Sequence, residues 1–540
     1  MIYLIYYYLI SFCLLGYGFL LSRILNLKFI NFGFLGLFGI SFLISISYLT
    51  TLFFVHDYFF NLVILISGIF LFTLFYKKKF YKYLLQHLII FTVLIIFILV
   101  AKNHDDFSYY HYPYSYFLTQ FEHPIGFGHL NNGFRNPSSI FFLNSLFYYP
   151  KIEFYLLNIS QVFFLGFSNI ILINLIFNKK IFKKLKFINF LSLLVLSFIN
   201  IFFYRLAEHG TDRSGMILIL IITILIFLIL NNNNKLIFIN ELNLFYIILI
   251  LLTILISLKP FYLIYSPLIL CIFTIKFFRI NFYKIIYSKI IFYSYIFVFF
   301  IFFFNFINSG CIVYPATFTC FDNLQWSFSK QMVGEVNEWY ELWAKAGASP
   351  NYIVENRSEY ISNFNWLNNW INNYFFNKVS DFLLGLTLFI LIFGKVFLRL
   401  DKKIYFTKQI KYKIVYIFLL ICLIEWFFKH PALRYGGYQL FALICFIPLA
   451  LLFNSQKMLY KNFYKKSFIM VIIIFIIFFS RNLNRIIEEN EKYDFNPFLS
   501  TKYIFDEKFY NRYIYHVEER QNEFKKINLF GKNFIITMSK

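Results

Sequence analysis

The chain has 540 residues, of which 60% are hydrophobic, 24% aromatic and only 14% charged. A water-soluble protein could not cover so much apolar surface with so few polar side chains, so the composition excludes a set of soluble domains. The formal net charge is +24. Because the Lys and Arg residues lie mostly in short loops between apolar runs, we expect a membrane protein and no nucleic-acid partner.

Continuous apolar runs of about 18 to 25 residues recur along the chain, and such a run crosses a hydrocarbon core about 30 Å thick. The runs are not alternating, which argues against a transmembrane barrel. We therefore predict an all-α, polytopic transmembrane helix bundle. The predicted spans, about fourteen in all, are 2–22, 30–54, 58–76, 83–101, 154–177, 186–204, 214–230, 242–258, 261–278, 286–306, 381–398, 412–429, 437–454 and 467–480.

Basic connections alternate along the chain so that they all fall on one side, which the positive-inside rule assigns to the cytoplasm. They are 23–28, 77–82, 178–186, 276–289, 395–413 and 455–466. The external side then receives two long loops, 102–153 and 307–380, together with the tail. We divide the chain into N-terminal helices (1–82), a core with both loops (83–480) and an external tail (481–540). The tail is either a small cap or a loosely ordered segment.

Two cysteines bracket a short external segment, CIVYPATFTC, that contains Pro315. An oxidising compartment favours a bridge between such a pair, so we predict a disulfide between Cys311 and Cys320.

Asp105 and Asp106 follow the fourth predicted span at the point where it leaves the membrane. Aromatic residues then recur at near-helical spacing, which suits an interfacial helix that Pro113 ends or kinks. This aromatic stripe consists of Phe107, Tyr110, Tyr114, Phe117 and Phe121. A second interfacial helix is expected after a cap at Ser138 or Ser139. Carboxylates at this boundary act as a general base or hold a divalent cation such as Mg²⁺ or Mn²⁺. The alternative is a solvated pair that closes a helix end.

Further polar residues gather in the external turns. Three histidines are candidate metal ligands or acceptor contacts: His104, His111 and His209. Four arginines are candidates to bind a lipid phosphate through paired hydrogen bonds: Arg135, Arg205, Arg213 and Arg434. The alternative for the arginines is a set of ion pairs that tie helices together. Five tryptophans in the second long loop suit membrane-interface anchors or platforms for sugar rings.

This layout resembles the GT-C superfamily of integral-membrane glycosyltransferases. The resemblance rests on a span followed at once by an external acidic pair (Asp105, Asp106), then interfacial helices, many spans, and basic residues in later external turns. The chain departs from the usual layout because about three further spans precede the span that leads into the acidic loop. The resemblance implies that the first-loop Asp is the catalytic base and that the donor is a sugar on a polyprenyl phosphate.

The expected function is therefore transfer of a sugar from a polyprenyl-phosphate donor to a cell-envelope glycan, lipid or protein acceptor. Arg434 or Arg205 would stabilise the departing phosphate. We expect a bacterial inner membrane, with the active face toward the periplasm. An envelope polysaccharide polymerase or ligase, and a polytopic transporter, are the alternatives.

Overall fold

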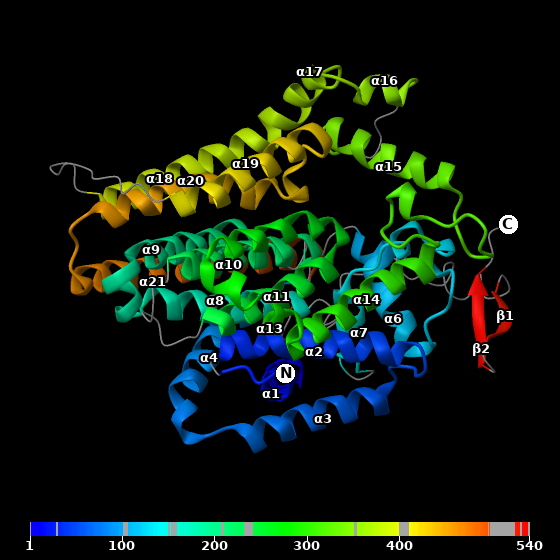
Figure 1. Cartoon of the computed structure of the whole chain (residues 1–540), viewed down its shortest axis with the longest axis horizontal. Helices are drawn as coiled ribbons and strands as arrows, with labels where there is room; N and C mark the ends of the chain where they lie inside the picture. The colour runs from blue at the N-terminus through cyan, green and yellow to red at the C-terminus, as the bar shows by residue number, and fades with distance from the viewer. Residues whose placement is uncertain are drawn as a thin grey trace.

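The predicted apolar runs form helices in the computed structural model (Figure 1). The structure describes residues 2–28, 31–100, 106–149, 152, 159–206, 210–231, 241–349, 354–398, 410–494, 496, 524–529 and 532–537. Eleven helices among these residues are long and apolar enough to cross a membrane. The protein is thus an all-α, integral, multi-pass membrane protein, as predicted.

The first half of the chain contributes the following elements: α1 (Ile2–Ile24), α2 (Phe32–Thr51), α3 (Tyr58–Phe75), η1 (Lys78–Phe80), α4 (Tyr81–Val93), α5 (Ile95–Ile98), η2 (Phe107–His111), α6 (Tyr112–Gln120), η3 (Phe127–His129), η4 (Asn132–Phe134), α7 (Ser139–Ser145), α8 (Ile159–Ile176), α9 (Lys179–Phe202), α10 (Gly210–Leu230) and α11 (Glu241–Leu258).

The second half contributes η6 (Pro260–Thr274), α12 (Lys276–Ile280), α13 (Phe282–Ile286), α14 (Lys289–Ser309), η7 (Thr317–Thr319), α15 (Lys330–Lys345), α16 (Arg357–Ile361), α17 (Leu367–Trp370), η8 (Ile371–Val379), α18 (Ser380–Phe397), α19 (Ile410–Lys429), η9 (Leu433–Tyr435), α20 (Gly437–Ser455) and α21 (Tyr460–Tyr493). Two short strands, β1 (Phe524–Leu529) and β2 (Lys532–Thr537), follow.

Three predicted spans differ from a regular apolar α-helix. The run 83–101 is broken at Leu94 into α4 and α5, and α19 includes the charged residues Lys413, Glu425 and Lys429. The run 261–278 forms η6, a 3₁₀-helix of 15 residues. Because a 3₁₀-helix rises about 2.0 Å per residue, η6 extends about 30 Å, which matches the thickness of a hydrocarbon core.

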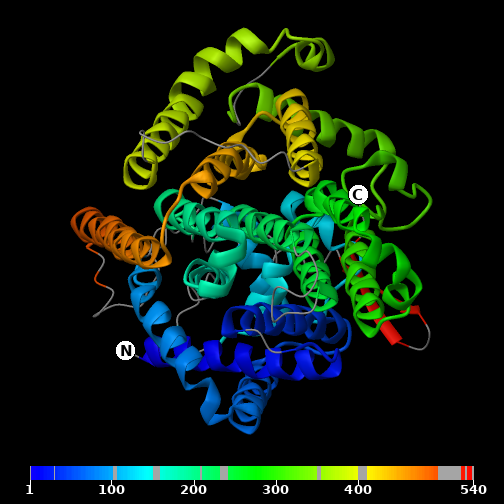
Figure 2. The same cartoon turned by 60° about the vertical axis from the view of Figure 1, so that its left-hand side comes forward.

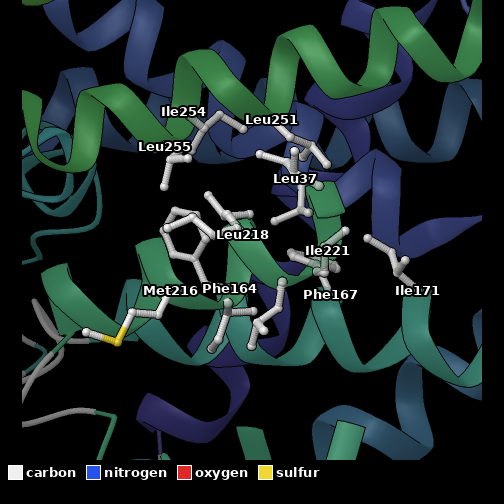
Figure 3. Close-up of a cluster of buried hydrophobic side chains, with 14 of the residues drawn as sticks. Leu37, Phe164, Phe167, Ile171, Met216, Leu218, Ile221, Leu251, Ile254 and Leu255 are labelled. Carbon is white, nitrogen blue, oxygen red and sulfur yellow. The ribbon is translucent and has the colours of Figure 1, made fainter. Parts of the chain in front are cut away.

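The bundle has three layers, with α8 to α11 in the middle. In Figures 1 and 2, α1 to α3 (blue) lie on one side of this layer and α18 and α19 (yellow-green and yellow) on the other. Burial follows the layers: 94% of the apolar window of α10 is buried inside the protein, against 11% of that of α3. Leu, Ile and Phe side chains from α2, α8, α10 and α11 form the centre of the core (Figure 3).

The ends of the bundle differ. Figure 1 shows α6, α15 and the β1–β2 hairpin at its right-hand end, whereas the connections from α3 to α4 and from α20 to α21 lie at its left-hand end. The described parts of both long loops therefore gather at one end of the bundle, and two of the basic connections lie at the other.

The predicted disulfide between Cys311 and Cys320 is present. It closes the segment that follows α14, where Gly310 adopts φ +78°. A side chain at Gly310 would be strained in this conformation, and its Cβ would approach the Cβ of Ser327 to 2.4 Å. The glycine thus ends α14 and turns the chain into the second long loop.

The first long loop forms α6 and α7, and Ser138 caps α7 by accepting a hydrogen bond from the Ile140 N–H at 3.4 Å. The aromatic stripe does not face lipid along its length, however. Tyr114 and Phe117 are 0% and 2% exposed and pack against Phe127. These rings stabilise the loop itself because they bury apolar area within it.

The tail includes more regular structure than its composition indicates. The last predicted span, 467–480, is part of α21, so the proposed boundary at residue 481 falls inside a helix. Beyond it, β1 and β2 pair as an antiparallel hairpin, and β2 lies beside η3 in the first long loop.

Candidate functional site

Arg434 lies between two carboxylates that come from distant parts of the chain. Its Nη2 is 3.6 Å from Oδ2 of Asp106, and its Nε is 3.4 Å from Oδ2 of Asp212. Asp106 immediately precedes η2, Asp212 is in the first turn of α10, and Arg434 is in η9 between α19 and α20. Three segments thus meet at one charged cluster.

Asp212 is the most deeply placed of these charged groups, with a side chain that is 6% exposed. Its Oδ1 pairs with Nζ of Lys259, the residue that precedes η6. The Tyr262 hydroxyl donates a hydrogen bond of 2.7 Å to the Asp212 carbonyl oxygen. Lys259 and Arg434 supply the positive charge that this buried carboxylate needs, because an unpaired buried charge would be costly.

Gly436 shapes the turn that presents Arg434. It has φ +109°, a conformation that residues with a side chain rarely adopt. The chain can therefore reverse directly after Tyr435 and begin α20 at Gly437. The glycines of the KHPALRYGG segment explain why the arginine is held at a tight turn.

Both π-helical segments in the described part of the chain border the cluster. η2 supplies Tyr110, whose hydroxyl donates to Oδ2 of Asp106 at 3.4 Å. η8 supplies Tyr374, whose hydroxyl accepts the Leu433 N–H at 2.9 Å. π-helical turns are rare and are frequent at functional sites, so their presence here supports a functional role for the cluster.

Aromatic rings surround the guanidinium group of Arg434. Its Cζ lies 5.2 Å from the ring centre of Trp343 and 5.6 Å from that of Tyr435. Trp343 belongs to α15, so the second long loop also reaches the cluster. Of the other tryptophans in that loop, Trp366 and Trp370 are buried within the protein.

The electrostatics keep these groups in their ordinary ionisation states. Burial by itself would lower the pKa of Arg434, but the charges of Asp212 and Asp106 outweigh it and raise the pKa above its usual value. Burial raises the pKa of Tyr435 to about 12, and burial also raises the pKa of Tyr110. At neutral pH the cluster therefore presents a permanent cation and protonated hydroxyl groups.

A cavity of about 80 Å³ adjoins Arg434. It is lined by Asp212, Arg213, Met216, Tyr374, Arg434 and Tyr438. A single water molecule needs about 10 to 15 Å³ measured in this way, so the cavity has room for a small polar group. Two guanidinium groups and two tyrosines supply hydrogen-bond donors, which suits an anion such as a phosphate.

Three of the residues predicted from the sequence thus come together: Asp106, Arg213 and Arg434. Arg205 lies in the turn after α9 and is not among the residues that line the cavity. Arg135 donates to the Gly128 carbonyl oxygen at 3.4 Å and to the Tyr314 hydroxyl at 3.3 Å, so it ties the two long loops together.

The histidine and metal predictions remain largely untested. Asp105, His104 and His209 lie outside the described residues. His111 packs against the ring of Phe141 at 5.1 Å. Within the described ranges, no group of three or more His, Cys, Asp or Glu side chains is placed to hold a metal ion.

Sequence reasoning missed Asp212 and Lys259 as site residues. Asp212 belongs to the charged turn RLAEHGTDR, and Lys259 precedes Pro260 between two apolar runs. The available signal was charge at the ends of spans, where an ionisable side chain needs a partner. The sequence does not show that these two residues are partners of each other and of Arg434.

The model of a family described as a domain of unknown function, DUF8201, matches residues 1–441. The match includes every residue of the cluster, from Asp106 to Arg434. No curated protein and no solved structure matches the chain significantly. Because the family model covers most of its length, the chain belongs to the DUF8201 family.

Proposed function

We propose that the protein is a membrane glycosyltransferase that moves a sugar from a polyprenyl-phosphate donor to a cell-envelope glycan, lipid or protein acceptor. The proposal rests on one observation: Arg434 lines a cavity together with Arg213, and Asp106 lies 3.6 Å from Arg434. A carboxylate next to an arginine that lines a phosphate-sized cavity supports such a transfer, because the acid can take up a proton while the arginine binds the phosphate.

The transfer is a single displacement at the anomeric carbon of the donor sugar. Asp106 accepts the proton of an acceptor hydroxyl as the oxygen bonds to the anomeric carbon, and the bond from that carbon to the phosphate oxygen breaks. The departing polyprenyl phosphate gains negative charge. Arg434 and Arg213 would stabilise this charge, since guanidinium groups donate paired hydrogen bonds to phosphate.

The position of the cluster favours a lipid-linked substrate. It lies where η2, α10 and η9 meet, outside the apolar stretch of α10 that follows Asp212. An isoprenoid chain would remain in the hydrocarbon while its phosphate reached the arginines. With the long loops external, the site would face the periplasm of a bacterial inner membrane.

A divalent cation, Mg²⁺ or Mn²⁺, was expected at Asp105 and Asp106. The described residues place Asp106 beside Arg434 and Tyr110, which are hydrogen-bond donors rather than metal ligands.

The experiment is a transfer assay with purified protein in lipid nanodiscs. A panel of sugars linked to polyprenyl monophosphate is compared with the same sugars linked to polyprenyl diphosphate. We expect product from a monophosphate donor, with loss of product in Arg434→Gln. Turnover of diphosphate donors alone would favour a polymerase or ligase, and no turnover of any donor would reject the proposal.

A further inference from the structure

Asp212 is buried, and each of its carboxylate oxygens faces a different cation. Oδ1 pairs with Lys259, and Oδ2 lies 3.4 Å from Nε of Arg434. The carboxylate is thus held through both of its oxygens. Its place in the cluster suits a group that holds another residue rather than one that transfers a proton.

The main chain at Asp212 is fixed as well. Its carbonyl oxygen accepts the Tyr262 hydroxyl at 2.7 Å. One turn later, a side chain at Gly215 would approach the Tyr262 ring to 2.3 Å, so α10 and η6 are in close contact here. Asp212 is therefore a rigid anchor, because its backbone and its side chain are both held.

Arg434 uses different edges of its guanidinium group toward the two acids. Nε faces Asp212, and Nη2 faces Asp106 at 3.6 Å. The contact at Nε is an ion pair and not a hydrogen bond, because this N–H has no hydrogen-bond partner among the described residues. Since the guanidinium group is planar, the attraction of Asp212 for its Nε edge still favours one orientation of the remaining N–H groups. If the ion pair with Asp212 were lost, the guanidinium group of Arg434 would be held less firmly and could turn away from its present orientation.

We propose that Asp212 is a positioning residue that fixes the orientation of Arg434 between Asp106 and the cavity. This inference rests on the proposed function for its effect on turnover, but the orientation of Arg434 can be measured independently. Lys259 has a different role: it is the second cation that compensates the buried charge of Asp212.

The test compares three variants: Asp212→Asn, Lys259→Gln and the double variant. The single Asp212→Asn change leaves Lys259 without its partner and risks poor folding. The double variant removes that pair as a unit, so its melting temperature should be nearer to that of the wild type. A purely structural Asp212 would then be dispensable in the double variant.

The first measurement is the rate at which phenylglyoxal modifies Arg434, followed by peptide mass spectrometry of the full-length protein. We expect modification about fivefold faster or more in Asp212→Asn and in the double variant, because the arginine has lost an ion-pair partner. Lys259→Gln should react at the wild-type rate. An unchanged rate in both Asp212 variants would overturn the proposal, whether or not the protein transfers sugars.

The second measurement is steady-state transfer from a polyprenyl-phosphate sugar. In the double variant we expect kcat to fall at least about tenfold, with a donor KM within about threefold of wild type, because Arg434 remains but is misaligned in the transition state. Wild-type kcat in the double variant would overturn the proposal. If the wild type itself shows no transfer, the proposed function fails, and the modification rates still decide whether Asp212 orients Arg434.

Discussion

At the scale of single residues, Arg434 connects three separate parts of the chain. It contacts Asp106 from the first long loop, Asp212 from α10, and Trp343 from the second long loop. An arginine suits this position because one planar group can face two acids and still stack against an aromatic ring. A lysine, with a single charged nitrogen, cannot do all three.

We therefore predict that Arg434→Lys lowers sugar transfer by about 10²-fold, the loss typical of removing one preorganised donor to a developing negative charge. Initial rates with a polyprenyl-phosphate sugar would measure this. Arg23→Lys is a matched control, because Arg23 also packs on a ring, 3.8 Å from the centre of Phe75, at the end of α1. Full activity in Arg434→Lys would show that charge alone is sufficient.

The residue types at the site could be predicted, but their contacts could not. Asp106 and Arg434 were candidates because each lies where a span meets an external turn. The contact between them depends on how the bundle packs, and the sequence holds no local pattern for it. Arg135 shows why the contacts could not be predicted. It was a phosphate-binding candidate on the same grounds as Arg434, but it donates hydrogen bonds to Gly128 and Tyr314 instead.

At the scale of elements, the first long loop is stabilised by a buried histidine. The Tyr114 hydroxyl accepts from Nδ2 of Asn308 at 3.3 Å and forms a second hydrogen bond, of 2.8 Å, with Nε2 of His123. Burial lowers the pKa of His123 to about 3. The histidine thus stays neutral in the folded protein over the ordinary pH range.

This predicts a definite pH dependence of stability. Between about pH 6.5 and pH 3 the unfolded chain binds a proton at this position that the folded protein does not, so the free energy of unfolding falls as the pH falls. From pH 7.5 to pH 5.5 the contribution of His123 is a loss of about 1.4 kcal/mol.

Melting in detergent at these two pH values should show a smaller acid-induced loss for His123→Asn than for wild type. His56 is also buried, and burial lowers its pKa to about 3 as well, so some pH dependence should remain in the variant. Identical pH dependence in both proteins would contradict the assignment of a neutral His123.

The disulfide stabilises a second element, the turn between α14 and α15. The disulfide closes a segment with a sequence separation of 9 residues. In the chain-entropy model, the loss of conformational entropy raises the free energy of the unfolded chain by about 3 kcal/mol. We predict that Cys311→Ser/Cys320→Ser lowers the melting temperature and makes the 311–320 segment sensitive to protease. A nonreducing peptide map of native protein in which both thiols are freely alkylated would contradict the bridge.

The helices were predictable as elements because uninterrupted apolar runs have few other structures available to them in a membrane. The segments that depart from α-helical geometry could not be predicted from the sequence. The 3₁₀-helix η6 is built from the same apolar and aromatic residues as the neighbouring α-helices, and the π-helix η8 continues directly from α17 into α18. Their hydrogen-bond patterns depend on the packing around them, which composition does not specify.

At the scale of the whole molecule, the sequence predicts which segments share an end of the bundle but not which helices are neighbours. The alternation of spans places the long loops together, as Figure 1 shows for α6 and α15. Helices such as α10 are apolar on every face, and nearly all of their residues are buried. Without a polar face, the sequence does not indicate the packing partners.

Orientation in the membrane is a prediction that labelling can test. We expect Asn323→Cys, on an exposed part of the second long loop, to react with an impermeant maleimide in intact cells, and exposed Lys183→Cys to react only after permeabilisation. Of the native free cysteines, Cys13, Cys271 and Cys422 are buried, whereas Cys445 is partly exposed, so the labelling of the unsubstituted protein is measured as the background. Reaction of Lys183→Cys alone from outside would invert the topology.

We propose that Asp106 is the base of the sugar transfer, and the turnover of Asp106→Asn with a polyprenyl-phosphate sugar tests this role. The Asp106 side chain is 30% exposed, so we expect the substitution to change stability by less than about 1 kcal/mol. Loss of a general base should lower kcat by roughly 10² to 10⁴.

Asp57→Asn is the matched control, because Asp57 is an exposed acid that caps α3, and asparagine caps a helix equally well. The account predicts normal melting for both variants, normal transfer for Asp57→Asn and near-complete loss of transfer for Asp106→Asn. Full transfer by Asp106→Asn would contradict it.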